Sequence, residues 1–438
     1  MIDIKHLREN PELYRENAKK KFKDPKQIDI VLNLDNEWRK IKLKADNLRA
    51  EKNKISERIN HEKKKGNNQI ENLIKKAREI PIQLEKTEEE EKNVYEKLRL
   101  ELYKVPNIIS LRVPIGKNDK ENVPGKYFGK PKKKNFEIKS HAEIAESLGV
   151  ADFESSARVS GTGFYYLEGE LALLNQALIN YAREIMVKKG FRYIETPLLL
   201  KEGIIDQVTD VRDKQQQIYL VESESSGTMA LIGTSEHSLI GRFAGQEVPL
   251  ISLPIKHTSY SMCFRKEIGS HGIDEKGLYR THQFNKIEMI VICKPEESEK
   301  FFEELKSITV EIFRGLEIPI RILKICSGDM GDLKYEQIDV EAYSPRKKDY
   351  FEVGSCSNLT DAQARKLGIF TRVKGQRIVP HTLNNTALAT SRALVAILEN
   401  NQQKDGSVKI PKVLWKYTKF KEIKAKKKNE NKKGKRKR

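Results

Sequence analysis

The chain has 438 residues, of which 38% are hydrophobic and 33% are charged, and its formal net charge is +20. This length predicts more than one domain. No stretch reaches the roughly 18 apolar residues that a membrane span needs, and the charged N-terminus does not resemble a secretory signal. We therefore expect a cytoplasmic protein without membrane segments.

The four cysteines lie far apart with no CxxC pair, and the eight histidines show no HxxxH or HExxH spacing. These spacings argue against a disulfide framework and a structural zinc site, and isolated thiols suit a reducing compartment. Cys356 would be a nucleophile in one interpretation, but a buried apolar role is favoured. We expect no zinc.

Residues 31–59 carry apolar side chains at alternating steps of three and four residues, the spacing of a coiled-coil seam. A glycine and two asparagines within 63–68 then predict a chain reversal. A helix of about thirty residues would extend on the order of 45 Å. The seam consists of Val31, Leu34, Trp38, Ile41, Ala45, Leu48, Ile55 and Ile59, with Lys52 at its one polar position.

A second apolar stripe follows the reversal, and Pro81 interrupts it, which predicts a kink or local unwinding. Together the stripes predict an antiparallel helical hairpin within residues 1–105. Because residues 39–65 are rich in Lys and Arg, an RNA-gripping arm is favoured over a dimerisation zipper, although the pattern leaves both open. The second stripe consists of Ile70, Ile74, Ala77, Leu84, Tyr95, Leu98 and Leu102.

Residues 106–140 contain four prolines and predict a connector. Residues 141–415 then read as a globular α+β domain in which strands outnumber helices and do not alternate with them, which predicts an antiparallel sheet flanked by helices. Neither a P-loop nor a strand-linked GxGxxG is present. The predicted helices are 171–189, 296–315 and 388–400, and the predicted strands are 191–197, 248–255, 259–265, 281–293, 319–326 and 350–353.

Residues 416–438 hold thirteen Lys and Arg against two Glu, a net charge of +11. Such a run builds no core, so we expect a basic disordered tail. It would act as a solubiliser or as a nonspecific phosphate-binding appendage. The rest of the chain still carries +9, which favours a polyanionic partner.

Four clusters in the second half carry the chemistry: IleGlyThrSerGluHis at 232–237, PheArgLysGlu at 264–267 with GlnPheAsnLysIleGlu at 283–288, PheGluValGlySerCysSer at 351–357, and AsnAsnThrAla with ThrSerArg within 384–392. Their arginines are suited to phosphates, and their carboxylates to Mg²⁺ or an ammonium group. Taken singly, each would more often be a surface salt bridge or a core residue.

Taken together, and in this order behind the helical arm, the clusters resemble the signature motifs of class II aminoacyl-tRNA synthetases, and specifically of seryl-tRNA synthetases. The resemblance runs from residue 1 to about 415. It implies ATP, Mg²⁺, serine and tRNA(Ser) as substrates and cofactors, and a homodimer formed through the 171–197 element. Whether tRNA(Sec) is also charged stays open.

The resemblance implies an ATP site. Arg265 would hold the α-phosphate and the serine carboxylate, Arg392 the γ-phosphate, and Glu352 with Ser355 the Mg²⁺ ion. Arg265, Arg392 and Glu352 would be the catalytic residues. The remaining contacts to ATP would come from Lys266, Glu267, Thr281, Phe284, Val353 and Gly354, with Glu267 and Thr281 reading the adenine and Phe284 stacking on it.

The resemblance likewise implies a serine site. Thr234, Ser235 and Glu236 would take the amino group, Glu288 would accept from the hydroxyl, and Thr386 would line the pocket. The chain departs from the usual pattern by having Ser235 for alanine, Gly354 for serine, AsnAsnThrAla for AsnGlySerGly and ThrSerArg for ValGlyArg. The serine pocket around Thr386 is where these departures matter most.

Two alternatives remain at this point. A ligase that loads a carrier protein would lack the long arm, so residues 26–102 argue against it. A non-catalytic RNA-binding relative would be expected to lose Arg265, Glu288 or Arg392, and all three are present.

Overall fold

The computed structural model describes residues 1–65, 71–267 and 277–424, with the side chains of 211–213 excepted. The chain divides into two units, Met1–Ile108 and Ile109–Arg438. Among the helices of the described residues, none combines the length and the apolar character that a membrane crossing requires.

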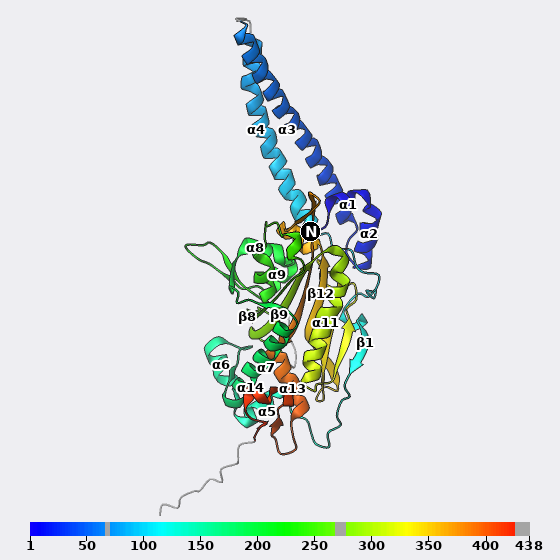
Figure 1. Ribbon diagram of the computed structural model, residues 1–438, viewed down its shortest axis with the longest axis vertical. Coiled ribbons are helices and arrows are strands. Elements are labelled where there is room, and N and C mark those ends of the chain that lie inside the picture. Colours follow the sequence, from blue (N-terminus) through cyan, green and yellow to red (C-terminus); the bar gives the residue numbers. More distant parts are fainter. Residues whose placement is uncertain (66–70, 268–276, 425–438) are drawn as a thin grey trace, which may run out of the picture. The chain divides into compact units, whose positions relative to one another are not determined.

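The first unit consists of two short helices, α1 (Ile4–Glu9) and α2 (Pro11–Lys20), and two long ones, α3 (Lys26–Lys64) and α4 (Glu71–Tyr103), which pack along each other (Figure 1). Cross-helix contacts join residue 27 to 101, 42 to 91 and 49 to 88. The second partner number falls as the first rises, so the pair is antiparallel, as predicted. Part of the predicted reversal at 63–68, and Ile70, lie outside the described residues.

The predicted seam of α3 is confirmed in large part, because Val31, Ile41, Ala45 and Ile55 are buried. The stripe of α4 differs from the prediction. Tyr95 is exposed, and the buried positions are Ile80, Leu84, Thr87, Val94, Leu98 and Leu102, which are three or four residues apart except for the step of seven between Thr87 and Val94. The polar Thr87 hid this regularity in the sequence, since its side chain is satisfied by donating to the Gln83 carbonyl at 2.7 Å.

Pro81 does not unwind α4, which is helical from Glu71 through Tyr103. The predicted interruption is therefore wrong as far as unwinding is concerned. The neighbouring Ile80 is buried while Ile82 is 70% exposed, so the helix keeps its period across the proline. Packing of the apolar side against α3 holds the turn in place despite the missing N–H.

The second unit is built on one eight-stranded sheet, in which every pairing is antiparallel except that of β4 with β8. This confirms the predicted α+β class. The strand order is β1 (Val123–Phe128), β10 (Ile320–Lys324), β11 (Glu336–Ser344), β12 (Asp349–Thr360), β15 (His381–Ala389), β9 (Gln283–Cys293), β8 (Ile255–Phe264) and β4 (Arg192–Tyr193).

Helices cover the two faces of this sheet differently. Residues 287, 289, 291 and 293 of β9 join the large core with α7 (Gly169–Lys188), α11 (Ser298–Gly315) and α13 (Thr390–Asn401). Ile290 and Ile292, on the other face, join a smaller core with α8 (Glu202–Val208), α10 (Ser235–Gly241) and α12 (Ala362–Leu367). The second group covers only one end of β9. The polar residues at the strand's other end therefore lie beside a cavity.

Shorter elements complete the unit, and Figure 1 shows α5, α7, α13 and α14 gathered at one end of it. The remaining helices are α5 (His141–Leu148), α6 (Phe153–Ser160), α9 (Val211–Gln217) and α14 (Trp415–Thr418), and the remaining strands are β2 (Ala151–Asp152), β3 (Tyr166–Leu167), β5 (Leu199–Lys201), β6 (Leu220–Val221), β7 (Met229–Leu231), β13 (Thr371–Val373), β14 (Gln376–Ile378), β16 (Val408–Lys409) and β17 (Glu422–Ile423).

Several predicted elements differ from the structure. The strand predicted at 350–353 extends over Asp349–Thr360, β11 and β15 were not predicted, and residues 388 and 389, predicted as helical, belong to β15. The predicted strand 248–255 is a 3-10 turn at Leu250–Ser252, and the strand begins only at Ile255. The predicted strand 191–197 is reduced to Arg192–Tyr193. The predicted connector is not separate, because its β1 forms the edge of the main sheet beside β10.

Residues 416–424, which we expected to begin the disordered tail, are folded. Ile423 is 1% exposed in the large core, β17 pairs with β16, and the Lys416 ammonium lies 2.8 Å from the Glu184 carboxylate on α7. Tyr417, Phe420 and Ile423, spaced three residues apart among the lysines, give this stretch apolar area to bury. The rest of the predicted tail, 425–438, lies outside the described residues.

Candidate active site

Two adjoining cavities open over the uncovered end of β9, one of ≈ 360 Å³ and one of ≈ 50 Å³. Four residues line both: Arg265, Lys286, Glu352 and Thr386. They come from β9, β12, β15 and the chain that leaves β8. Side chains from four distant parts of the sequence therefore meet in one place.

Lys286 and Glu288 are two residues apart on β9, so they point to the same face of the sheet. Glu288 is opposite Thr386 in the pairing of β9 with β15, and the Thr386 hydroxyl donates to Glu288 Oε2 at 3.2 Å. The Lys286 ammonium lies 2.6 Å from the same oxygen. Both contacts are to Oε2, so Oε1 has no hydrogen-bond partner among the described residues, and Glu288 lines the larger cavity.

A second carboxylate, Glu236, lines the same cavity from the first turn of α10, where Thr234 is the N-cap residue. Gln363 donates to Glu236 Oε1 at 2.8 Å and itself accepts from the Thr382 hydroxyl at 2.9 Å. Burial, and next the nearby charge of Glu288, raise the pKa of Glu236 to about 7. A cation in the cavity would favour the ionised form of this carboxyl.

Arginine and carboxylate side chains form the other end of the site. Arg392 Nη1 lies 3.0 Å from the Glu352 carbonyl oxygen and 3.1 Å from Glu352 Oε2. Arg265 Nε donates to the Gly233 carbonyl at 3.2 Å, and its guanidinium lies 5.4 Å from the centre of the Phe284 ring. Both guanidinium groups keep donors for an anionic ligand, since each has five N–H groups.

A β-bulge places Glu352 and Ser355 on the same face. The two are three residues apart, which on a regular strand would put them on opposite faces. The pairing of β11 with β12 is irregular between Val340 and Glu341, however, and both Glu352 and Ser355 line the larger cavity. The extra residue at Val353 thus shifts Ser355 onto the face of Glu352.

These residues fit a divalent cation. Gln337 Nε2 lies 2.9 Å from Ser355 Oγ and 3.0 Å from Asp339 Oδ1. Burial, and next the charge of Glu352, raise the pKa of Asp339 to about 7. Burial also acts to raise the pKa of Glu352, but Arg392 together with Arg265 and Lys334 lowers it below the ordinary value. Two carboxylates and a hydroxyl are oxygen ligands that Mg²⁺ prefers, and a dication would relieve the repulsion between them.

The structure therefore brings most of the sequence-predicted residues together. Lys266 and Ser235 line neither cavity; Ser235 is fully buried, and the Lys266 backbone N–H donates to the Gln217 carbonyl at 2.9 Å. The predicted residues that line the cavities are Thr234, Glu236, Arg265, Glu267, Thr281, Phe284, Glu288, Glu352, Val353, Gly354, Ser355, Thr386 and Arg392.

The sequence reasoning missed Lys286, Gln363, Asp339 and Tyr279. Only Lys286 left a readable signal, because it lies two residues before Glu288 on a predicted strand. Tyr279 lines the smaller cavity beneath Arg392, whose guanidinium lies 5.5 Å from its ring centre. Gln363 and Asp339 could not be identified from the sequence, because the residues they neighbour in the site, Glu236 and Glu352, are distant in sequence.

Gly354 packs closely against the strand that carries Thr386. A Cβ at this position would lie 3.0 Å from the Thr386 carbonyl oxygen and 3.1 Å from Thr309 Cγ2. Thr309 in turn donates to the same carbonyl at 2.9 Å. A side chain at 354 would therefore push on the backbone that positions Thr386, which gives a physical reason for glycine here.

Two separate parts of the chain match different family models. Residues 1–109 match "Seryl-tRNA synthetase N-terminal domain", and residues 219–401 match "tRNA synthetase class II core domain (G, H, P, S and T)". The chain is similar to the serine–tRNA ligase of Methanocella arvoryzae, at 42% identity over 95% of this chain and 98% of the relative. It is also similar to that of Pyrococcus horikoshii, at 41% identity over 97% of each chain.

Two solved structures resemble it over nearly the whole chain. One is the seryl-tRNA synthetase of Pyrococcus horikoshii complexed with ATP, with a TM-score of 0.90, 40% identity and coverage of 98% of this chain and 100% of that one. The other is the cytoplasmic serine–tRNA ligase of Naegleria fowleri in complex with AMP, with a TM-score of 0.85, 32% identity and coverage of 95% and 96%.

Proposed function

The chain belongs to the seryl-tRNA synthetase family, and from this premise we propose that it activates serine with ATP and transfers the seryl group to tRNA(Ser). The observation that carries the proposal is that Arg265 lines both cavities. The Arg265 guanidinium thus borders both the smaller cavity, which contains Arg392, and the larger cavity, which contains Glu236 and Glu288. A reaction that joins an amino acid to a nucleotide phosphate needs this arrangement.

In the first step, the serine carboxylate attacks the α-phosphorus of ATP, and pyrophosphate leaves. Arg265 holds the two reacting groups together and stabilises the negative charge that develops between them. Arg392 holds the leaving phosphates, and its position is fixed by Glu352 and by the Tyr279 ring. In the second step, a ribose hydroxyl of the tRNA attacks the acyl carbon, and AMP leaves.

Serine is selected by the two carboxylates of the larger cavity. Glu236 and Thr234 bind its ammonium group, and Glu288 Oε1 accepts a hydrogen bond from its hydroxyl. Alanine would leave that oxygen without a donor, which costs about 1–3 kcal/mol or more for a charged acceptor. Threonine is refused by volume, because Thr386 is fixed in place by its contact with Glu288.

ATP stacks its adenine on Phe284, with Glu267 and Thr281 at its edge. Mg²⁺ held by Glu352 and Ser355, with Asp339 beside them, would supply charge neutralisation for the triphosphate. Glu352 is partly exposed to the cavity and close to Arg392, so the chain's own residues already orient the carboxylate for this role.

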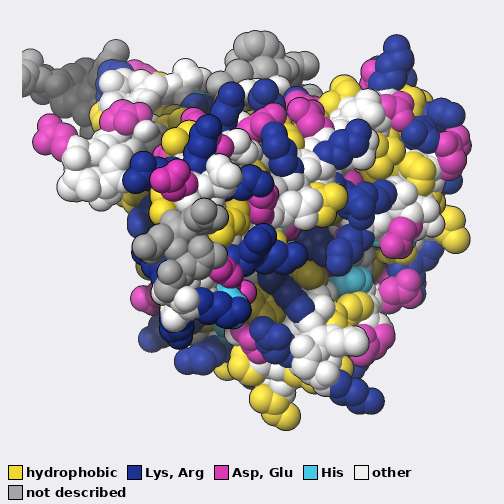
Figure 2. All heavy atoms as spheres, turned by 90° about the horizontal axis from the view of Figure 1, so that it is seen from above, with side chains coloured by type: hydrophobic (Ala, Val, Ile, Leu, Met, Phe, Trp, Pro, Cys, Tyr) yellow, Lys and Arg dark blue, Asp and Glu magenta, His cyan; other side chains and the backbone are white. Residues whose placement is uncertain are grey.

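The first unit serves as the tRNA grip, and the enzyme acts in the cytoplasm as a homodimer. Support for a positively charged grip comes from residues 39–65, which hold eleven Lys and Arg against four Asp and Glu. Figure 2 shows one face of the protein, on which Lys and Arg side chains are scattered among Asp, Glu and apolar side chains. Support for a dimer through α7 comes from Leu173 and Val187, which are 56% and 54% exposed on that helix.

The direct test is serine-dependent ATP–pyrophosphate exchange with purified protein. We expect exchange with serine and at least tenfold less with alanine, glycine or threonine. Exchange at background level, or equal rates with glycine and serine, would overturn the proposal. Aminoacylation of tRNA(Ser) and of tRNA(Sec) by the same preparation decides which tRNAs are charged.

A further inference from the structure

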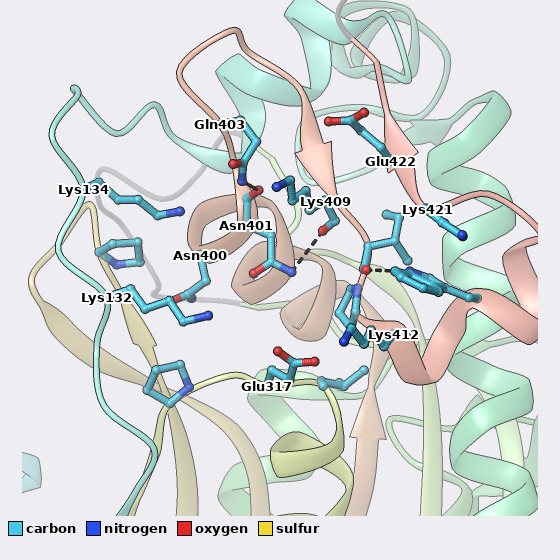
Figure 3. A pocket seen from close by; sticks show the side chains of 16 residues that line it. Lys132, Lys134, Glu317, Asn400, Asn401, Gln403, Lys409, Lys412, Lys421 and Glu422 are labelled. Atoms are coloured by element: carbon cyan, nitrogen blue, oxygen red, sulfur yellow. Dashed lines mark hydrogen bonds between the residues drawn. The ribbon is translucent and has the colours of Figure 1, made fainter.

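A separate cavity of ≈ 560 Å³ lies in the second unit, and none of its lining residues belongs to the site described above. It is enclosed by the 132–134 segment, the end of α11, the end of α13 and the chain from β16 to β17 (Figure 3). Five lysines line it: Lys132, Lys134, Lys409, Lys412 and Lys421. They come from two parts of the chain that are far apart in the sequence, 132–134 and 409–421.

These lysines lack acidic partners. Among the described residues, none of the five has a carboxylate within ion-pair distance, although the lining also includes Glu317 and Glu422. Glu422 is engaged elsewhere, since it accepts from the Ser407 hydroxyl at 2.7 Å. Three of the ammonium groups, those of Lys132, Lys134 and Lys409, point into the space between them in Figure 3.

Lys134 shows the electrostatic consequence of this crowding. Its ammonium lies 3.3 Å from the Gln402 carbonyl oxygen. Burial, and next the charges of Lys132 and Lys409, lower its pKa. A bound anion beside Lys134 would offset the repulsion from these two neighbouring lysines by attraction.

The rest of the lining is rigid. The Trp415 indole donates to the Ile410 carbonyl at 2.9 Å, and the Lys421 ammonium lies 4.7 Å from the Trp415 ring centre. Asn401 Nδ2 donates to the Lys409 carbonyl at 3.0 Å, and Gln403 Nε2 to the Asn401 carbonyl at 2.7 Å. These contacts fix lining residues relative to one another in the absence of a ligand, which lowers the entropic cost of binding.

We propose that this cavity binds a compact polyanion that carries two or more phosphate groups. A concave site of this volume is in the range of small-molecule sites, and five converging lysines match more than one phosphate. An RNA backbone would instead be gripped along an extended stripe of basic residues. Inorganic oligophosphate and a nucleoside triphosphate share the required chemistry.

Trp415 makes the proposal directly testable. The chain has two tryptophans, so Trp38→Phe in the full-length protein leaves Trp415, inside the cavity, as the only one. The fluorescence of this protein is titrated with inorganic tripolyphosphate, ATP and adenosine, and calorimetry with tripolyphosphate counts the binding sites. A variant with K132Q, K134Q and K409Q is compared with a control carrying K201Q, K300Q and K324Q, which removes three exposed lysines outside this cavity and outside the proposed active site.

We expect tripolyphosphate to bind in a saturable way, with the affinity reduced at least about tenfold in the first triple variant and unchanged in the control. Equal binding of tripolyphosphate and ATP, with none of adenosine, would identify the phosphates as the recognised group, and tighter binding of ATP would add the base. The absence of a lysine-dependent site in both measurements would overturn the proposal. A response to tRNA alone, lost in the first variant, would also overturn it in favour of a nucleic-acid contact.

Discussion

The ammonium group of Lys286 lies 2.6 Å from the carboxylate of Glu288, and the two side chains are only 7% and 2% exposed. The pair stands at the uncovered end of β9, where it forms the floor of the proposed serine pocket. A buried ion pair of this kind positions its carboxylate precisely, but it leaves a costly unpaired charge when one partner is removed.

Lys286→Met should therefore destabilise the protein by about 3–5 kcal/mol and raise the KM for serine, because Glu288 is left buried without its cation. Chemical unfolding and ATP–pyrophosphate exchange measure the two effects. Lys306→Met is the matched control, since its pair with Glu303 is partly exposed and should cost no more than about 1 kcal/mol. Equal losses in both variants would contradict the role of the buried pair.

Serine binding should depend on the ionisation of Glu236. Its pKa is raised to about 7, above the ordinary value of 4.5, so the carboxyl is protonated in the free site at lower pH. Serine affinity should fall by about tenfold per pH unit below 7 and level off above it. The free protein shows the opposite trend, because the contribution of this group to stability is full below about 4.5 and is lost as the pH rises through 7.

Calorimetric titration with serine between pH 6 and 8 tests this expectation. Glu236→Gln should bind serine weakly and with a flat pH profile, while Glu137→Gln, an exposed position, should keep the wild-type slope. A slope that persists in Glu236→Gln would show that another group is responsible.

Gly277→Ala should destabilise the protein near the proposed active site, although Gly277 does not line it. The residue has φ +116°, and a Cβ would lie 2.2 Å from His141 Nε2, the atom that accepts from the Leu278 N–H at 3.0 Å. His141 also lies 3.5 Å from Glu399 on α13, the helix that carries Arg392. We expect a stability loss of about 3 kcal/mol or more, because steric overlap adds to backbone strain.

Gly190→Ala separates the cost of backbone strain from the cost of steric overlap. Gly190 also has a positive φ, +80°, but nothing lies within 4 Å of the added Cβ, so only the strain of about 1–3 kcal/mol applies. Thermal and chemical unfolding of the two variants measure the difference. Similar losses would mean that His141 moves aside without cost.

Pro81→Ala should stabilise α4, because it restores a backbone N–H inside a helix that already continues through this position. The gain is expected to be at most about 3 kcal/mol, and amide hydrogen exchange of residues 77–85 detects it locally. Lys86→Ala, at an exposed position of the same helix, should change protection by no more than about 0.5 kcal/mol. Unchanged or weaker protection in Pro81→Ala would indicate that the proline is required by the packing.

Truncation after Lys424 should weaken tRNA binding at low salt and flatten its salt dependence. Residues 425–438 contribute nine Lys and Arg and one Glu, and each phosphate contact adds to the slope of log K against log salt. Truncation at this point spares residues 416–424, which belong to the fold. An equal-length tail with glutamine for each Lys and Arg is the control, and unchanged affinity after truncation would mean that the tail only solubilises the protein.

The sequence by itself determined the features that arise from local periodicity. The seam of α3 and the positions of α7, α11 and α13, to within two residues at each end, follow from helical periodicity. The alternation of a strand likewise places Lys286 on the face of Glu288, although Lys286 was not identified from the sequence. The charged motif residues were likewise readable, because they stand in recognisable order along the chain.

Only the tertiary structure decided the features that depend on partners distant in sequence. Thr386 contacts Glu288 because of the register of β15 on β9, and Glu352 shares a face with Ser355 because of a bulge opposite β11. Residues 416–424 fold because Glu184 and the large core receive them. A strand's periodicity gives the direction of its side chains, but register, bulges and burial are set by the free energy of the whole packed sheet, which no local pattern contains.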